Sequence, residues 1–226
     1  MELTILISGI LIFIVTCVII FIIFGRRKRE VKIYLVGCAG SGKTKLFYYL
    51  STKQILPTLT SQSRNQYQIE LNDKKGNLID LPGHPRIRTE VMNSIKDATA
   101  IIFVIDSQTA LEKMSDIGNF VYDILIEEQI YKRKVPILIV GSKSDLSNAR
   151  SIDMISSELE NELDYIRKNR QRSTYVENNE DSTLFLGQED TDFSFSQLSN
   201  SVTFCACSVN TEKVEDVLDF IKLYLH

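Results

Sequence analysis

Residues 37–44 of the chain read Gly-Cys-Ala-Gly-Ser-Gly-Lys-Thr, and this stretch decides the fold. It satisfies the pattern G-x-x-x-x-G-K-[ST], in which glycines allow backbone N–H groups to converge on phosphate oxygens. Lys43 would supply a positive charge to the β- and γ-phosphates, and Thr44 would offer a hydroxyl to Mg²⁺. The apolar run at 31–36 precedes the motif and a helical pattern follows it, as the motif requires. The nucleotide-binding residues predicted in this loop are Gly37, Cys38, Ala39, Gly40, Ser41, Gly42, Lys43 and Thr44.

From the phosphate loop to the end of the chain, short apolar runs alternate with longer helical patterns. This alternation is typical of an α/β fold with a mostly parallel sheet and helices on both faces. The polar connector at 72–76 predicts an antiparallel hairpin between two short strands. The expected strands are 31–36, 67–71, 77–79, 100–105, 136–140 and 202–205. The expected helices are 43–50, 86–98, 110–131, 152–170 and 214–225. The sequence thus predicts a six-stranded P-loop NTPase domain.

A second motif, Asp80-x-x-Gly83-His84, follows the expected hairpin. A carboxylate that ends a strand beside the phosphate loop can hold Mg²⁺, so Asp80 is a predicted metal ligand together with Thr44. Gly83 can bring its backbone N–H to the γ-phosphate. His84 lies where a residue that orients the attacking water would act, and we predict it as the catalytic residue. The alternative is that His84 is an ordinary surface loop residue.

The loop after the strand at 136–140 contains Ser142, Lys143 and Asp145. Here the order of elements resembles the Ras-like small GTPases, whose guanine loop reads Asn-Lys-x-Asp; Ser142 stands in place of the asparagine. The resemblance implies that the Asp145 carboxylate accepts from guanine N1 and N2 and that the Lys143 stem packs on the purine. Ser208, Val209 and Asn210 lie where the family has Ser-Ala-Lys, and only the serine matches. GTP and Mg²⁺ are the implied cofactors. The switch threonine on Mg²⁺ is predicted to be Thr60, with Thr58 as the alternative.

The beginning of the chain is apolar. Residues 3–24 carry no charged side chain, and a helix of about 22 residues spans ~33 Å, roughly one hydrocarbon core. Four basic residues follow at 26–29, an order that places the following domain in the cytosol and argues against a cleaved signal peptide. We therefore expect a transmembrane anchor at 1–25, a basic juxtamembrane segment at 26–30 and a GTPase domain at 31–226. Within that domain, 171–200 reads as a polar insertion.

Charge and cysteine content argue against several other classes of protein. The net charge of −3 gives no basis for direct nucleic-acid binding. The four cysteines form no CxxC pair and no Cys/His cluster, so neither a cysteine metal site nor a disulfide framework is expected.

A closer resemblance covers nearly the whole chain. The anchor followed by a GTPase domain, the string at 79–84 and the Phe-Ser-Phe-Ser-Gln-Leu string at 193–198 are similar to the beta subunits of the signal recognition particle receptor. The resemblance implies residence in the endoplasmic reticulum membrane, slow GTP hydrolysis, a role in co-translational protein targeting and an alpha subunit that docks on the switch regions. Two alternatives stay open: a trafficking GTPase of the Arf/Sar type, and a nucleotide-loaded scaffold with little turnover.

Overall fold

The structure is a computed structural model that describes residues 9, 13–17, 30–58, 61, 63–71, 74–177 and 185–225, with the backbone alone at 172–177. The chain divides into two compact units, residues 1–30 and residues 31–226. In the first unit, Gly9 and residues 13–17 are helical and exposed. Within the described ranges, no helix has both the length and the apolar character needed to cross a membrane. The predicted anchor lies mostly outside the described residues, and the basic residues at 26–29 and Thr60 lie wholly outside them.

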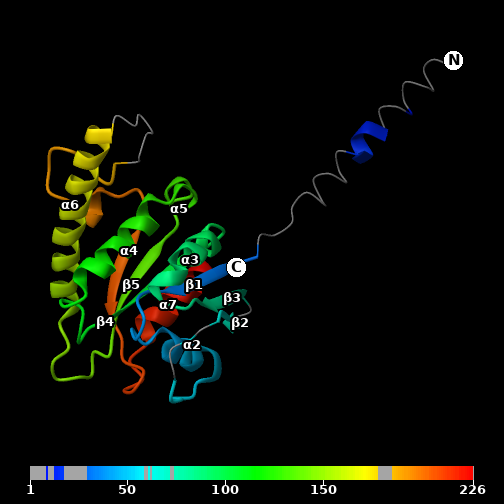
Figure 1. Cartoon of the computed structure of the whole chain (residues 1–226). Helices are drawn as coiled ribbons and strands as arrows, with labels where there is room; N and C mark the ends of the chain where they lie inside the picture. Colours follow the sequence, from blue (N-terminus) through cyan, green and yellow to red (C-terminus); the bar gives the residue numbers. More distant parts are fainter. Residues whose placement is uncertain are drawn as a thin grey trace. The chain divides into compact units, whose positions relative to one another are not determined.

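The second unit is built on one six-stranded sheet in the order β2-β3-β1-β4-β5-β6 (Figure 1). β2 runs antiparallel to β3, and every other neighbouring pair is parallel. This arrangement confirms the predicted six-stranded, mostly parallel sheet. The strands are β1 Lys32–Val36, β2 Asn65–Leu71, β3 Lys74–Asp80, β4 Ala100–Asp106, β5 Ile137–Ser142 and β6 Val202–Ala206.

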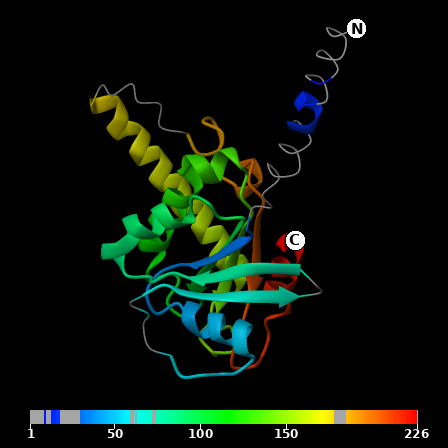
Figure 2. The ribbon, with the colours of Figure 1, turned by 90° about the vertical axis from the view of Figure 1, so that its right-hand side faces the viewer.

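Helices cover both faces of the sheet, because the central strands are apolar on both sides. In β4, six consecutive residues are buried, which suits a strand enclosed between two helical layers. One core cluster joins the sheet to α3, α4 and α6, and the other joins it to α2 and α7. Figure 2 shows α2 alongside the β2–β3 pair. The α-helices are α2 Lys43–Thr52, α3 Arg88–Ile95, α4 Met114–Ile126, α5 Glu128–Lys132, α6 Ile152–Glu177 and α7 Glu215–Tyr224.

The predicted helix at 110–131 is two helices in the structure. Glu127 has extended backbone angles (φ −61°, ψ 121°) and separates α4 from α5. The break lets Ile130 enter the core, where it is fully buried. The buried side chain of Asn200 donates to the carbonyls of Ile130 and Val135, at 3.1 and 2.9 Å, and so caps the short second helix. The single-helix prediction was wrong because these partners are distant in sequence.

The predicted helix at 86–98 also has a different start. Residues Pro85–Ile87 form a short 3₁₀ helix, and α3 begins only at Arg88. Proline at the first position of the 3₁₀ turn fits its fixed φ angle and its missing N–H. The His84 side chain caps this turn, so the motif Asp80-x-x-Gly83-His84 runs directly into it.

The polar stretch predicted as an insertion at 171–200 is not uniform. α6 continues past Arg170 to Glu177, and residues 185–198, which we call the strap, return along the domain. Phe193 and Phe195 of the strap are buried in the core cluster that includes α6. Their rings meet edge to face, with centroids 5.4 Å apart. The strap is therefore part of the packed domain, although its composition is polar.

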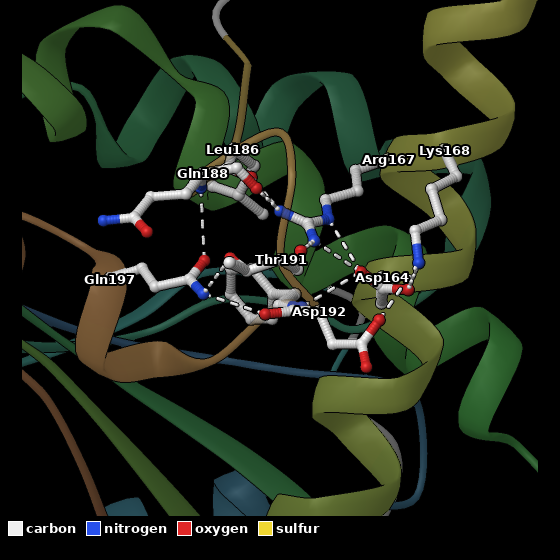
Figure 3. A network of polar contacts seen from close by, with 9 residues as sticks. Asp164, Arg167, Lys168, Leu186, Gln188, Thr191, Asp192 and Gln197 are labelled. Atoms are coloured by element: carbon white, nitrogen blue, oxygen red, sulfur yellow. Dashed lines mark hydrogen bonds and ion pairs between the residues drawn. The ribbon is translucent and has the colours of Figure 1, made fainter.

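Arg167 of α6 holds the strap (Figure 3). Its side chain is 1% exposed, and its guanidinium donates to the carbonyls of Leu186 and Gln188, at 3.1 and 2.8 Å, and to that of Thr191. Asp164, one turn earlier on α6, accepts from the same guanidinium at 2.6 and 2.9 Å and from the Phe193 N–H at 3.0 Å. A buried charge is tolerated only when it is paired and its donors are satisfied, and this arrangement meets both conditions.

Candidate nucleotide site

The phosphate loop joins the carboxyl end of β1 to the first turn of α2. Gly37, Gly40 and Gly42 have φ angles of +141°, +79° and +85°, a region that side chains rarely allow. A Cβ on Gly37 would also overlap the Val104 carbonyl oxygen of the neighbouring strand. The glycines therefore shape the loop, which ends at the positive pole of α2, a favourable place for phosphate.

Lys43 is buried inside this loop. Its Nζ donates to the Cys38 carbonyl at 2.9 Å and lies 3.4 Å from the Ser41 hydroxyl. Burial lowers the pKa of the Lys43 ammonium group, while the nearby Asp80 and Cys38 oppose that shift. The loop thus holds a partly desolvated cation among its own carbonyl and hydroxyl groups, as a phosphate clamp requires.

Thr44 and Asp80 meet beside the lysine. The Thr44 hydroxyl donates to Asp80 Oδ2 at 2.9 Å, and the Asn65 amide donates to the same oxygen at 3.1 Å. Asp80 Oδ1 is buried and has no hydrogen-bond partner. Burial raises the pKa of Asp80, against the effect of the two hydrogen bonds and of Lys43.

These groups fit Mg²⁺. The ion usually takes one or two protein groups and completes its shell with waters and phosphate oxygens. A threonine hydroxyl and a carboxylate with an open acceptor atom are such groups. No cluster of three or more His, Cys, Asp or Glu side chains occurs within the described ranges, and an ion held in this way needs none.

Gly83 lies against the phosphate loop. A Cβ on Gly83 would come within 2.5 Å of the Gly37 carbonyl oxygen, 2.6 Å of Lys43 Nζ and 2.8 Å of the Ala39 nitrogen. A cleft of about 220 Å³ lies beside this contact, and its lining includes Gly83, Lys43, Thr44 and Thr58. The structure therefore places Thr58, the alternative switch threonine, at the cleft.

His84 does not line this cleft. The side chain is exposed, and its Nδ1 accepts from the Arg86 N–H at 3.2 Å. A neutral ring that accepts at Nδ1 carries its proton on Nε2, which can then only donate. In this orientation the imidazole caps the 3₁₀ turn and cannot accept a proton from water.

A second cavity of about 110 Å³ adjoins the first and shares Gly42, Lys45 and Lys143 with it. The predicted base-reading residues Ser142, Lys143, Asp145 and Val209 line it, together with Gly42, Lys45, Leu46, Leu146, Cys207 and Asn210. The Lys143 ammonium group pairs with Asp106 at 2.7 Å. Most of the phosphate and base residues predicted from the sequence thus line two adjacent cavities, whereas Gly37, Cys38, Ser41 and Ser208 are not among the lining residues.

Ser142 ties the base loop to the phosphate loop. Its buried hydroxyl donates to the Ser41 carbonyl at 2.7 Å. In the same region, Asp145 accepts from the Ser208 hydroxyl at 2.7 Å and from the Asn210 amide at 3.0 Å. These two hydrogen bonds hold the pKa of Asp145 below its usual value.

Four residues of the site were not predicted from the sequence: Lys45, Asn65, Asp106 and Asn210. Asn65 pairs with Asp80 in the hairpin register, which the predicted start of that strand at residue 67 left out. Asp106 ends β4 beside the phosphate loop, and the rule that parallel strands present their carboxyl ends to a ligand could have identified it. Lys45 follows the motif directly and faces the base cavity.

Comparison with known proteins gives a consistent result. The family model for the signal recognition particle receptor beta subunit matches residues 28–202. The human receptor subunit beta is 34% identical over 205 residues, covering 88% of this chain and 76% of the relative. The subunit beta of Saccharomyces cerevisiae is 30% identical over 211 residues, covering 87% and 85%.

Solved structures show the same fold. A structure described as the mammalian SRP receptor has a TM-score of 0.76 and 31% identity, and covers 84% of this chain and 97% of its own. A GTP-bound relative from Chaetomium thermophilum, solved as a complex with SRX, has a TM-score of 0.67 at 22% identity, with coverage of 85% and 97%. ADP-ribosylation factor J of Dictyostelium discoideum is a more distant relative, 29% identical over 66% of this chain and 76% of its own. This chain therefore belongs to the family of signal recognition particle receptor beta subunits.

Proposed function

We propose that the chain is a membrane-anchored, GTP-binding subunit of a signal recognition particle receptor, which docks an alpha subunit at the endoplasmic reticulum. The observation that carries this proposal is the pair of adjacent cavities, one lined by the phosphate-loop lysine and the other by Asp145, whose carboxylate accepts from Ser208 and Asn210. The first fits a triphosphate and the second fits a base with adjacent donors. Family membership supports the role as a receptor subunit.

Each group of the site has a defined role in binding. Lys43 and the loop N–H groups would hold the phosphates, and Gly83 would present its N–H toward the γ-phosphate. Thr44 and Asp80 would hold Mg²⁺, with Thr58 or Thr60 as the switch ligand. When bound, Mg²⁺ would neutralise charge between the β- and γ-phosphates. Asp145 would accept from guanine N1 and N2, with Lys143 beside the purine, and Ser208 and Val209 would complete the base pocket.

Hydrolysis is proposed to be slow. His84 is the proposed catalytic residue, but its ring accepts from the Arg86 N–H and lies outside the cleft lining. It must turn before it can accept from an attacking water. Slow turnover suits a subunit whose GTP-bound form serves as a docking surface for the alpha subunit.

The anchor is proposed from the sequence of residues 1–25 and the basic residues at 26–29. An uncharged run of this length spans a bilayer, and the bases keep the GTPase domain on the cytosolic side. A trafficking GTPase of the Arf/Sar type is the second candidate, because Arf proteins are among the relatives. A permanent anchor would distinguish the receptor subunit from a GTPase that leaves the membrane with GDP.

The test uses the full chain in detergent. We expect tight binding of GTP, with ATP at least ~100-fold weaker because its base edge does not match an aspartate. Lys43→Ala should abolish measurable GTP binding, since the phosphate charge loses its buried counter-charge. Asp145→Asn should shift preference from GTP toward xanthosine triphosphate, whose base edge matches an amide. Equal affinity of the unmutated chain for ATP and GTP would contradict the proposal.

A further inference from the structure

Asn210 connects two charged residues that line the base cavity, Asp145 and Lys45. Its Nδ2 donates to Asp145 Oδ2 at 3.0 Å, and its Oδ1 accepts from Lys45 Nζ at 2.6 Å. A carboxylate can only accept and an ammonium group can only donate, so the two partners fix which end of the amide is which. All three side chains line the cavity.

The loop that carries Asn210 has a defined shape. Ser208 and Lys213 form an antiparallel bridge, with the Ser208 N–H donating to the Lys213 carbonyl at 3.0 Å. The Glu212 N–H donates to the Val209 carbonyl at 3.3 Å, and Glu212 has a φ angle of +59°. The turn at 208–213 thus holds Asn210 at the cavity on a backbone that is already hydrogen-bonded.

The same turn also supplies the hydrogen bond to the second carboxylate oxygen of Asp145. The Ser208 oxygen accepts from the Thr211 N–H at 3.2 Å, which directs its own proton to Asp145 Oδ1 at 2.7 Å. Asp145 Oδ1 thus accepts from the Ser208 hydroxyl and Oδ2 from the Asn210 amide. Each carboxylate oxygen has two acceptor positions, so neither of these side-chain bonds alone uses up an oxygen. Two bonds from one loop set the plane of the carboxylate.

Lys45 links this group of hydrogen bonds to the cavity that the phosphate loop lines. It directly follows Thr44 on α2 and lines both cavities. The Asn210 amide stands between Lys45 and Asp145 in the chain of hydrogen bonds. The lysine thus holds the amide oxygen of Asn210 while the amide nitrogen donates to Asp145.

The alternative is a polar surface turn without a role in binding. An isolated exposed asparagine contributes little, because water replaces its hydrogen bonds at small cost. Asn210 differs because both ends of its amide contact a charged group at the cavity, and because its partner is the residue that would read the base. The chemistry of the contacts therefore favours a role in recognition.

We propose that Asn210 is a positioning residue for guanine recognition: it sets the plane of the Asp145 carboxylate so that guanine N1–H and the 2-amino group bind together. This inference rests on the proposed binding of guanine nucleotides. Inosine lacks the 2-amino group, so it cannot use the second acceptor. Correct positioning of the carboxylate should therefore matter more for guanosine than for inosine nucleotides.

The experiment measures GDP, IDP and ADP affinities of the full chain in detergent, by calorimetry. We expect Asn210→Ala to weaken GDP about tenfold and IDP only about twofold, so that the GDP-to-IDP preference falls about fivefold. Asn210→Asp, which is the same size but cannot donate when ionised, should reduce the preference at least as much. Lys45→Ala, which leaves the amide free to turn, should give a smaller fall in the same direction.

Thr211→Ala is the matched control, since it alters a side chain of the same turn but keeps the backbone N–H that Ser208 uses. Its GDP-to-IDP preference should equal that of the unmutated chain. An unchanged preference in both Asn210 variants would overturn the inference, and so would equal losses of GDP and IDP, because these indicate a general loosening of the turn. If the unmutated chain bound ADP as well as GDP, the proposed function itself would fail. Circular dichroism melting of each variant without nucleotide shows whether it is folded.

Discussion

Ser142 joins the two halves of the nucleotide site through one short side chain. Its hydroxyl reaches the Ser41 carbonyl at 2.7 Å. A serine is enough here because its short side chain already reaches that carbonyl. The departure from the Asn-Lys-x-Asp pattern thus leaves the base loop attached to the phosphate loop.

Replacement of Ser142 by alanine should loosen this attachment. The buried Ser41 carbonyl would lose its partner, and an unsatisfied buried acceptor costs roughly 1–3 kcal/mol. We expect GDP to dissociate about tenfold faster from Ser142→Ala, as followed by displacement of a fluorescent nucleotide. Ser144→Ala, in the same loop, is the control and should dissociate at the unmutated rate. Equal rates for both variants would show that the Ser142 hydroxyl does not hold the loops together.

His84 gives a prediction about rate. Because its Nδ1 accepts from the Arg86 N–H, the ring should contribute little to turnover until a partner reorients it. We expect His84→Ala to change intrinsic single-turnover GTP hydrolysis by less than about twofold, but to remove most of the stimulation by the alpha subunit. GTP affinity should stay nearly constant.

The control for His84 is Glu90→Ala on α3, an exposed residue near the same turn. If His84→Ala and Glu90→Ala are stimulated equally by the alpha subunit, His84 has no catalytic role. The nucleotide-loaded scaffold would then describe this chain better than a slow GTPase.

At the scale of elements, local patterns predicted the buried strands well and the connections poorly. The apolar run that became β4 was predicted to within one residue. By contrast β2, an edge strand with mostly exposed side chains, begins two residues earlier than expected, at Asn65. Its residues alternate weakly because only one lies in the core, so hydrophobicity cannot mark its start. The break at Glu127 has a similar cause, since Asn200 caps α5 from a distant part of the chain.

The candidate site divides in the same way. Residues of the phosphate loop follow one another in the sequence, so the motif identified all of them. No short motif identifies the other residues of the site, because strand pairing or the path of a distant loop brings them there. These residues are Asn65, Asp106 and Asn210. The hydrogen bond between Asn210 and Lys45 joins residues that are far apart in sequence and meet only in the folded chain.

Arg167 and the strap support a prediction about stability. Arg167→Met would leave the half-buried Asp164 and the strap carbonyls without their buried donor, and removal of one partner from a buried ion pair costs about 3–5 kcal/mol. We expect a fall in melting temperature of about 6–12 °C and faster hydrogen exchange at residues 185–198. Arg170→Met on the same helix, where the side chain is 43% exposed, should cost less than about 1 kcal/mol. Equal effects of both substitutions would contradict the anchoring role of Arg167.

Asp164 gives a pH-dependent prediction for the same network. Burial raises its pKa, but hydrogen bonds from Lys168, Arg167 and the Phe193 N–H outweigh burial and hold it below the ordinary value of 3.8. The unfolded chain therefore takes up this proton first, and the stability that Asp164 contributes is lost as the pH falls below about 3.8. In urea unfolding between about pH 6 and pH 3, Asp164→Asn should be less stable at pH 6 but should lose less stability on acidification. Parallel curves would exclude this contribution.

At the scale of the whole molecule, the division at residue 30 separates a mostly apolar N-terminal sequence from the α/β sequence that follows it. Residues 31–226 form a compact unit with a core on each face of the sheet. Val31, the first residue of this unit, is already buried in one of those cores. The nucleotide cavities are lined by residues of this unit alone. Folding and nucleotide binding should therefore not need the first unit.

Removal of residues 1–25 tests this separation and the proposed anchor together. The truncated chain keeps the four bases at 26–29 and should be soluble, monodisperse and able to bind GTP with the affinity of the full chain. In flotation with liposomes, the full chain should float after a high-salt wash, because about 20 apolar residues insert essentially irreversibly. The truncated chain should float only with anionic lipids and only at low salt, since basic residues add about 1 kcal/mol each near such a surface.

Substitution of the four bases by glutamine should then abolish flotation of the truncated chain at any salt. A truncated chain that is soluble and monodisperse but does not bind GTP would place the domain boundary before residue 26. Release of the full chain from neutral liposomes by salt would contradict the proposed transmembrane anchor. That result would favour a GTPase that associates reversibly with membranes.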